Sequence, residues 1–226
     1  MKIAIENVLQ RIAAACARCG RDEDEIKLIA VSKNFPAEVV QEAYDTGLRA
    51  FGENKAQEFR DKSRLLNSDI EWHFIGHLQT NKIKYVVPRA GLIHSVDSLR
   101  LAQALAKYAL RKEVNVNILL EVNTSAESSK FGIAPEALED TFGEILELPG
   151  LVVKGLMTMA PFVNDERKVR NSFMLLRELQ GKIMRFTAPE HVKELSMGMS
   201  ADFEWAIEEG STMVRIGTAI FGARRR

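Results

Sequence analysis

A single (β/α)8 barrel spanning residues 1–226 is the fold class that this sequence predicts. Short apolar segments alternate with longer segments of helical periodicity, and eight such alternations run from residue 26 to residue 216. Strands that alternate with helices through short loops form right-handed βαβ units and a parallel sheet, and eight units suffice to close a barrel. The length also suits one such barrel. An open doubly wound sheet is the main alternative, but no G-x-G-x-x-G motif follows the first strand.

The strands are predicted from short apolar runs. In the first, residues 26–31, five of six residues are apolar, which indicates a strand covered on both faces. The others are predicted at 50–52, 72–75, 92–95, 117–122, 151–156, 194–196 and 213–216.

The helices are predicted from apolar residues spaced three and four apart. After an opening helix that ends at Gly20, they are expected at 36–46, 56–66, 81–87, 99–109, 135–145, 173–183 and 200–209, with Ser200 starting the last and Asp202 in its first turn. The chain stops shortly after the eighth strand, so the opening helix is expected to close the helix ring from the other end.

Cys16 and Cys19 form a single C-x-x-C motif, which suits a redox pair or half of a zinc site. Both continue the apolar face of the opening helix, and no second motif or nearby histidine completes a metal site. We expect the two cysteines to pack as small apolar side chains.

The charge balance excludes several partner classes. Lys plus Arg equals Asp plus Glu at 31 each, so no net field attracts nucleic acid or anionic lipid, and the tail 224–226 is expected to be a solvated end. Polar residues interrupt the first seven positions before a signal-peptide core could form, and no apolar run reaches membrane-spanning length. The expected location is the cytoplasm.

Lys33 lies just past the end of the first predicted strand. Partial burial at the mouth of an apolar strand disfavours the ammonium form and leaves more free amine to attack a carbonyl, which is the chemistry of a Schiff base. A surface lysine at the start of a loop is the competing interpretation, and position alone does not decide between them.

Residues that can hydrogen-bond or react follow nearly every predicted strand. Barrel active sites lie at the carboxyl ends of the strands, so these residues mark the expected functional face. They are Lys33, Asn54, His77, Ser95, Asn123, Thr158, the segment 196–200, and Arg215 with Gly217.

The loops after strands seven and eight are the usual phosphate site of this fold. Ser200 offers a hydroxyl at an expected helix start, Gly217 allows close approach of the backbone, and Thr218 adds a second hydroxyl. A small phosphate group suits this arrangement. The competing interpretation is that Ser200 only caps its helix and Gly217 only makes a turn.

Six ordered segments together closely resemble the pyridoxal phosphate homeostasis protein family. The match spans nearly the whole chain, and no departure occurs at the positions that matter. The segments are AVSK at 30–33 with Pro36, FGENK at 51–55, WHFIGHLQ at 72–79, SKFG at 129–132, LSMGMS at 195–200 with Asp202 and Phe203, and VRIGT at 214–218.

The resemblance implies a barrel of the alanine-racemase type that holds pyridoxal 5′-phosphate (PLP) as an internal aldimine on Lys33. It further implies that Ser200, Gly217 and Thr218 hold the phosphate, that Arg215 faces the pyridine nitrogen, and that Asn54 lies beside the ring. Arginine stays protonated and only donates, so the ring nitrogen should remain unprotonated and the ring should be a weak electron sink.

A carrier or regulator of PLP is therefore expected rather than an efficient catalyst, with PLP-dependent apoenzymes as partners. A racemase of this type resembles a two-domain dimer whose second domain supplies a tyrosine, and this chain leaves no room for that domain after Arg226. A single barrel is expected to be a monomer. The competing enzymes are an amino-acid racemase, which would also be yellow, and a Schiff-base aldolase without PLP, which would be colourless.

Overall fold

The computed structural model describes residues 1–125 and 131–222 and shows a closed barrel of eight parallel strands in the order β1 to β8. The strands are β1 Lys27–Val31, β2 Ala50–Glu53, β3 Glu71–Phe74, β4 Leu92–Val96, β5 Val116–Glu121, β6 Leu151–Met157, β7 Glu194–Met199 and β8 Met213–Ile216. Parallel pairing of β8 with β1 closes the ring. The predicted fold class is confirmed, and each predicted strand is present with ends shifted by up to three residues.

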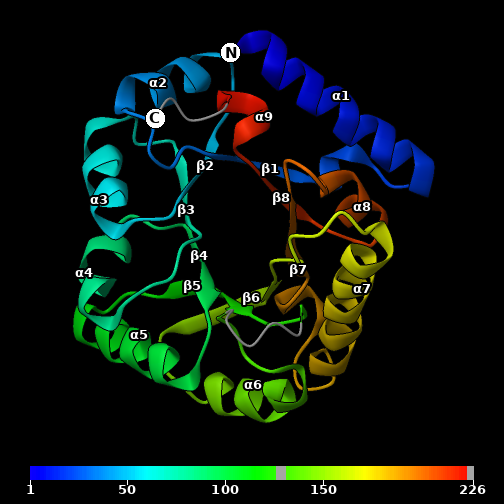
Figure 1. The fold of residues 1–226 in the computed structure, drawn as a ribbon. Helices are drawn as coiled ribbons and strands as arrows, with labels where there is room; N and C mark the ends of the chain where they lie inside the picture. The colour runs from blue at the N-terminus through cyan, green and yellow to red at the C-terminus, as the bar shows by residue number, and fades with distance from the viewer. Residues whose placement is uncertain (126–130, 223–226) are drawn as a thin grey trace.

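Helices surround the barrel in the described part of the chain (Figure 1). The α-helices are α1 Lys2–Cys19, α2 Ala37–Asp45, α3 Ala56–Leu65, α4 Ile83–Val86, α5 Leu99–Lys112, α6 Leu138–Leu146, α7 Glu166–Ile183, α8 Phe203–Glu208 and α9 Thr218–Phe221. Short 3-10 helices lie at Glu23–Glu25, Thr80–Lys82, Pro135–Ala137 and Pro189–His191. None of the helices described is long and apolar enough to cross a membrane.

Helix α1 takes the place in the ring outside β8 and β1, as the sequence predicts (Figure 1). Its inner face, which includes Ile5, Val8 and Ile12, is buried in the core. On its polar side, Arg11 pairs with Glu204 of α8 at 3.1 Å. The cysteines follow the packing interpretation, because Cys16 is buried in this face and Cys19 packs partly buried against it, both with free thiols.

The structure differs from the prediction in two places after β7. The last predicted helix does not start at Ser200 but at Phe203, after a turn in which the backbone N–H of Met199 donates to Asp202 Oδ1 at 2.6 Å. Asp202 therefore precedes the helix instead of lying in its first turn. The second difference is α9, a helix of one turn after β8, which is too short to leave a periodic pattern in the sequence.

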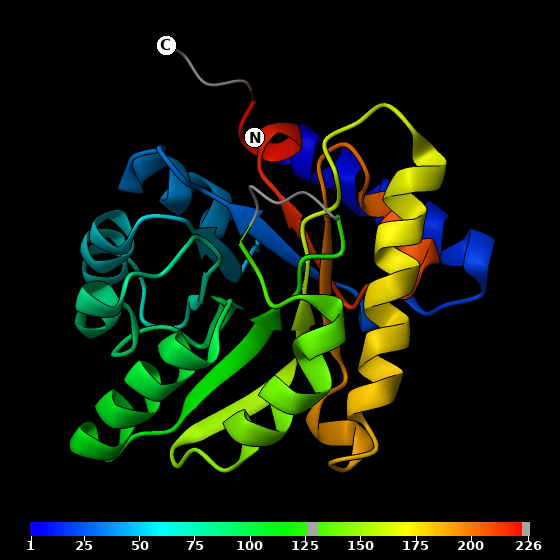
Figure 2. The same ribbon diagram turned by 60° about the horizontal axis from the view of Figure 1, so that its bottom comes forward.

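The interior of the barrel is filled by side chains from alternate positions of the strands, as the period of two in a strand requires. Its apolar part is a cluster separate from the larger core between strands and helices, and consists of Ile29, Ala50, Leu92, Leu119, Met157 and Met213. Figure 2 shows the barrel from the side, with β5 pointing to the end where α9 lies. The carboxyl ends of the parallel strands all meet at this end.

Candidate functional site

The six predicted site residues lie at the carboxyl ends of four strands that are neighbours in the closed barrel, β7, β8, β1 and β2. In chain order, Lys33 stands two residues after β1, Asn54 directly after β2, Ser200 directly after β7, Arg215 inside β8, Gly217 directly after β8, and Thr218 at the start of α9. One side of the barrel rim therefore carries the whole set.

The loops after β7 and β8 meet at Ser200. Its Oγ accepts long hydrogen bonds from the backbone N–H of Gly217 at 3.3 Å and of Ala219 at 3.4 Å. Gly217 also packs closely on the end of β1, because a Cβ at this position would lie 3.3 Å from the carbonyl oxygen of Val31. Backbone N–H groups that converge on one oxygen, together with the exposed Thr218, suit the oxygens of a phosphate.

Arg215 is buried inside the barrel below this rim, with 5% of its surface exposed. Its Nη1 donates to Ser196 Oγ at 2.6 Å and its Nη2 donates to the carbonyl oxygen of Thr158 at 2.9 Å. Burial lowers the pKa of Arg215 to about 10, opposed by the carboxylates of Asp202 and Glu121. The guanidinium is therefore charged at neutral pH and held in one plane by two bonds.

The half-buried Lys33 follows a buried ionic cluster between β1, β2 and α3. Glu53 Oε1 accepts hydrogen bonds from Ser32 Oγ at 2.7 Å and from Lys62 Nζ at 2.6 Å, and Lys62 also donates to the carbonyl oxygen of Ser32 at 2.9 Å. Burial raises the pKa of Glu53, while Lys62 opposes the rise. Ser32, the residue before Lys33, is thus held by hydrogen bonds of both its side chain and its backbone.

Asn54 is locked in place by the loop after β3. A Cβ at Gly76 would lie 2.1 Å from the backbone oxygen of Asn54, so only glycine allows this approach. The side-chain Oδ1 of Asn54 is buried and has no hydrogen-bond partner among the described residues. A buried acceptor without a partner is costly to the apo protein, and it is available to a donor on a bound ligand.

Glu121, at the end of β5, is a site residue that sequence reasoning missed. It alternates with the interior residue Leu119, so its side chain faces the barrel interior, and it is buried. Burial raises its pKa to about 7, the charge of Asp97 adds to the rise, and Arg215 opposes it. Glu121 lies inside the predicted strand 117–122, among apolar residues, and the residues considered at the end of that strand began at Asn123.

His73 and His94 were missed for a related reason. Each lies inside a strand that is covered on both faces, and the side chains of both histidines are completely buried. His73 Nδ1 lies 2.8 Å from His94 Nε2, and His94 Nδ1 lies 2.8 Å from Ser196 Oγ. Ser196 is therefore a link between Arg215 and two interior histidines.

Other residues singled out by position have structural roles or lie elsewhere. Ser95 Oγ donates to the carbonyl oxygen of Gly76 at 2.6 Å, and Thr158 Oγ1 donates to that of Val122 at 2.8 Å. Asn123 Oδ1 accepts from Ser125 Oγ at 3.0 Å. Lys130 and the tail 224–226 lie outside the described residues.

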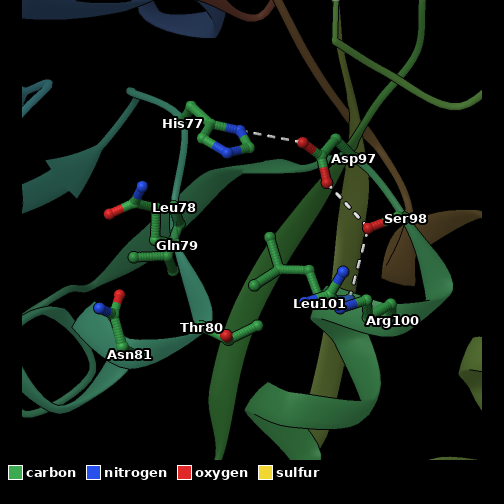
Figure 3. A pocket seen from close by; sticks show the side chains of 9 residues that line it. All are labelled: His77, Leu78, Gln79, Thr80, Asn81, Asp97, Ser98, Arg100 and Leu101. Carbon is green, nitrogen blue, oxygen red and sulfur yellow. Dashed lines mark hydrogen bonds and ion pairs between the residues drawn. The ribbon is translucent and has the colours of Figure 1, made fainter.

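His77 is part of a separate polar pocket of about 320 Å³ between the β3 and β4 loops (Figure 3). Its Nδ1 lies 3.1 Å from Asp97 Oδ2, and its ring stacks on Phe131 with centroids 4.1 Å apart. In the described chain, this pocket includes none of the six predicted site residues.

Comparisons with known proteins agree with the barrel fold. Residues 3–225 match the family model described as alanine racemase, N-terminal domain. The chain is 47% identical over 222 residues to the pyridoxal phosphate homeostasis protein of Aquifex aeolicus, covering 98% of this chain and 97% of that one. It is 42% identical over 225 residues to the protein of the same name in Escherichia coli K12, covering 97% and 95%.

Among solved structures, PipY of Synechococcus elongatus with PLP bound superposes with a TM-score of 0.84 at 34% identity, covering 95% of this chain and 100% of that one. Fold, motifs and full-length identity lead to one conclusion. This chain belongs to the family of the alanine racemase N-terminal domain, together with the pyridoxal phosphate homeostasis proteins.

Proposed function

We propose that this chain binds PLP through a Schiff base on Lys33 and acts in intracellular PLP homeostasis as a carrier or regulator, not as an efficient catalyst. The observation that carries the proposal is the gathering of the six site residues at the ends of four neighbouring strands, around the buried charge of Arg215. The names of its relatives and the PLP bound to PipY support the choice of cofactor.

The residues present fit PLP part by part. The loops after β7 and β8 supply Ser200, Gly217 and Thr218 for the phosphate, and two of these already approach each other at 3.3 Å. Arg215 supplies a fixed positive donor for the ring nitrogen. Asn54 supplies a buried acceptor beside the ring, and Lys33 supplies the amine.

When bound, PLP supplies an electrophilic imine and an electron sink for reactions at an amino acid's α-carbon. Arg215 limits the second property, because a protonated ring nitrogen would face a buried guanidinium. The residues of this chain therefore bind and orient the cofactor while keeping the sink weak.

Efficient racemisation also needs an acid or base on each face of the α-carbon. The three tyrosines of the chain, Tyr44, Tyr85 and Tyr108, lie on the outer helices α2, α4 and α5. None of them reaches the mouth of the barrel to serve as the partner of Lys33. We propose that the protein is a monomer in the cytoplasm and that it exchanges PLP with PLP-dependent apoenzymes.

The visible spectrum of the purified protein, before and after borohydride, tests the proposal. A yellow protein whose imine band disappears on reduction, with the label mapped to Lys33, is the expected result. A Lys33→Ala variant should fold normally, since a residue at the rim contributes little to the core, and should lose the imine band. Lys55→Ala, which removes an exposed lysine nearby, is the matched control.

A colourless protein that still forms an imine with carbonyl substrates would support the aldolase instead. An unchanged imine band in the Lys33→Ala variant, or reduced cofactor mainly on Lys130, would refute the assignment of the lysine. Rapid exchange of the α-proton of L-alanine by the parent would refute the carrier role and favour a racemase.

A further inference from the structure

A chain of polar contacts runs through the barrel interior, away from the rim. It begins at Arg215 Nη1, which donates to Ser196 Oγ at 2.6 Å, and continues from Ser196 Oγ to His94 Nδ1 and from His94 Nε2 to His73 Nδ1, each at 2.8 Å. These four residues come from β8, β7, β4 and β3, so the contacts cross the inside of the barrel. Ser196, His94 and His73 are completely buried.

The chain ends at the amino-terminal face of the barrel. His73 Nε2 lies 3.2 Å from Glu71 Oε1, a contact that does not meet hydrogen-bond geometry, and Lys27 Nζ donates to both oxygens of Glu71 at 2.7 and 2.9 Å. The contacts with His73 and then with Lys27 lower the pKa of Glu71 to about 2. Glu71 and Lys27 line a cavity of about 210 Å³ on this face, so a charged pair accessible to solvent closes the chain.

The partners fix which nitrogen of each histidine carries a proton. Glu71 is a carboxylate and only accepts, so His73 must present an N–H at Nε2, and in the neutral ring Nδ1 is then an acceptor. His94 must donate to that Nδ1 from its own Nε2. Burial keeps the pKa of His94 well below its ordinary value, and the positive charges of Arg215 and Lys27 lower it further. Its Nδ1 is therefore an acceptor.

Ser196 completes the chain. Its hydroxyl hydrogen points to His94 Nδ1, which leaves the oxygen as an acceptor for Arg215. Every donor from Arg215 to His73 then points the same way, towards Glu71. A doubly protonated His73 would reverse the two imidazole links, and Ser196 would accept from both sides.

We propose that Ser196, His94, His73 and Glu71 form a one-way relay, three links of hydrogen bonds ended by the contact of His73 with Glu71, that positions Arg215 against the ring nitrogen of the cofactor. These four are positioning residues, and they act through Arg215. The purpose of the relay rests on the proposed function, whereas the direction of its hydrogen bonds follows from this chain's own residues. It joins the cofactor face of the barrel to the opposite face.

Packing alone does not require polar side chains at these interior positions. Barrel interiors are filled mainly by branched aliphatic residues, and the apolar part of this interior includes such residues, for example Ile29 and Leu119. Buried imidazoles are favourable only when their hydrogen bonds are satisfied. Two such rings in line with Arg215 indicate that they serve to position its guanidinium group.

Nitrogen-15 NMR of the histidine rings in the PLP-free protein tests the direction of the relay. The chain has only four histidines, and His73→Gln and His94→Gln variants assign the two interior rings. We expect both to be single Nε2–H tautomers at pH 7.5. A doubly protonated His73, or a Nδ1–H tautomer of either ring at pH 7.5, would overturn the proposal.

The Glu71→Gln substitution tests the purpose of the relay. It removes the charge that holds the proton on His73 Nε2, at a half-exposed site where folding is preserved. Glu194→Gln is the matched control, because Glu194 lines the same cavity but accepts from Thr212 Oγ1 at 2.7 Å, outside the relay. In the PLP-free protein, only Glu71→Gln should give mixed tautomers of the two rings.

In the PLP-loaded protein, only Glu71→Gln should shift the pH at which the two visible absorption bands interconvert. The shift should be downward, because a less firmly held Arg215 admits a proton to the ring nitrogen, and a positive ring lowers the pKa of the neighbouring imine. Equal titrations of parent, Glu71→Gln and Glu194→Gln would refute the positioning role. Failure to bind PLP would refute the proposed function, and the NMR measurement on the PLP-free protein would still decide whether the relay exists.

Discussion

Replacing Glu121 with glutamine should make the protein more resistant to alkaline conditions. Glu121 is buried in the barrel interior, where burial raises its pKa to about 7 from an ordinary 4.5. A raised carboxyl pKa means that the folded state holds a proton that the unfolded state has released. The stability that this proton provides is complete at acidic pH and is lost as the pH rises towards 7.

The size of the effect follows from the two pKa values. The difference between 4.5 and about 7 corresponds to about 3–4 kcal/mol at about 1.4 kcal/mol for each pH unit. Between pH 5 and pH 8 the parent should therefore lose about 2.5 kcal/mol of unfolding free energy through this group alone. Glutamine cannot ionise, so the Glu121→Gln variant should not show this loss.

Urea unfolding at pH 5 and pH 8 measures the difference. The unfolding free energy of Glu121→Gln, relative to the parent, should rise by about 2.5 kcal/mol between the two pH values. Glu144→Gln, at an exposed position of α6, should show no such rise. If Glu121→Gln follows the parent at both pH values to within about 0.5 kcal/mol, the buried carboxyl does not titrate as the structure indicates.

Five other substitutions probe the cluster near Lys33 and the cofactor contacts. Lys62→Met should lower the unfolding free energy, measured in urea, by about 3–5 kcal/mol, because Glu53 loses its buried partner. Adding Glu53→Gln should recover part of this loss. A loss below about 1 kcal/mol in Lys62→Met would contradict the prediction. Ser200→Ala and Thr218→Ala should each weaken PLP retention in equilibrium dialysis by about 1–2 kcal/mol, and unchanged retention by both would place the phosphate elsewhere. Arg215→Glu should favour a protonated ring nitrogen and start slow deuterium exchange at L-alanine in heavy water; no exchange by a PLP-loaded variant would show that a missing acid or base limits the chemistry.

The sequence sufficed for the barrel and for the residues that follow its strands. Lys33 and Gly217 could be placed because each comes just after an apolar run, and an apolar run ends where a strand ends. The prediction that Ser200 starts a helix was wrong. The hydrogen bond from the Met199 N–H to Asp202 Oδ1 makes a turn between β7 and α8, and a turn of this kind moves a helix start without changing its periodicity.

The interior residues could not be predicted in the same way. A strand covered on both faces shows no polar alternation, so His73 between Trp72 and Phe74 carries no sign of which side it faces. Only the register of the closed barrel shows that His73 and His94 point into the same space. Contacts between β4 and β7, which are 102 positions apart at the His94–Ser196 pair, depend on the closure of the ring.

The charge of Arg215 explains why the proposed weak electron sink does not depend on the pH of the cell. With a pKa of about 10, the guanidinium is about 99% charged even at pH 8, so its full burial does not neutralise it. Two bonds, to Ser196 and to the Thr158 carbonyl, keep it from turning away. A proton on a ring nitrogen beside it would place two positive charges together in a buried space, where the repulsion is poorly screened. The restraint on catalysis that we propose therefore comes from the barrel wall itself, so changes confined to the surrounding loops should leave it in place.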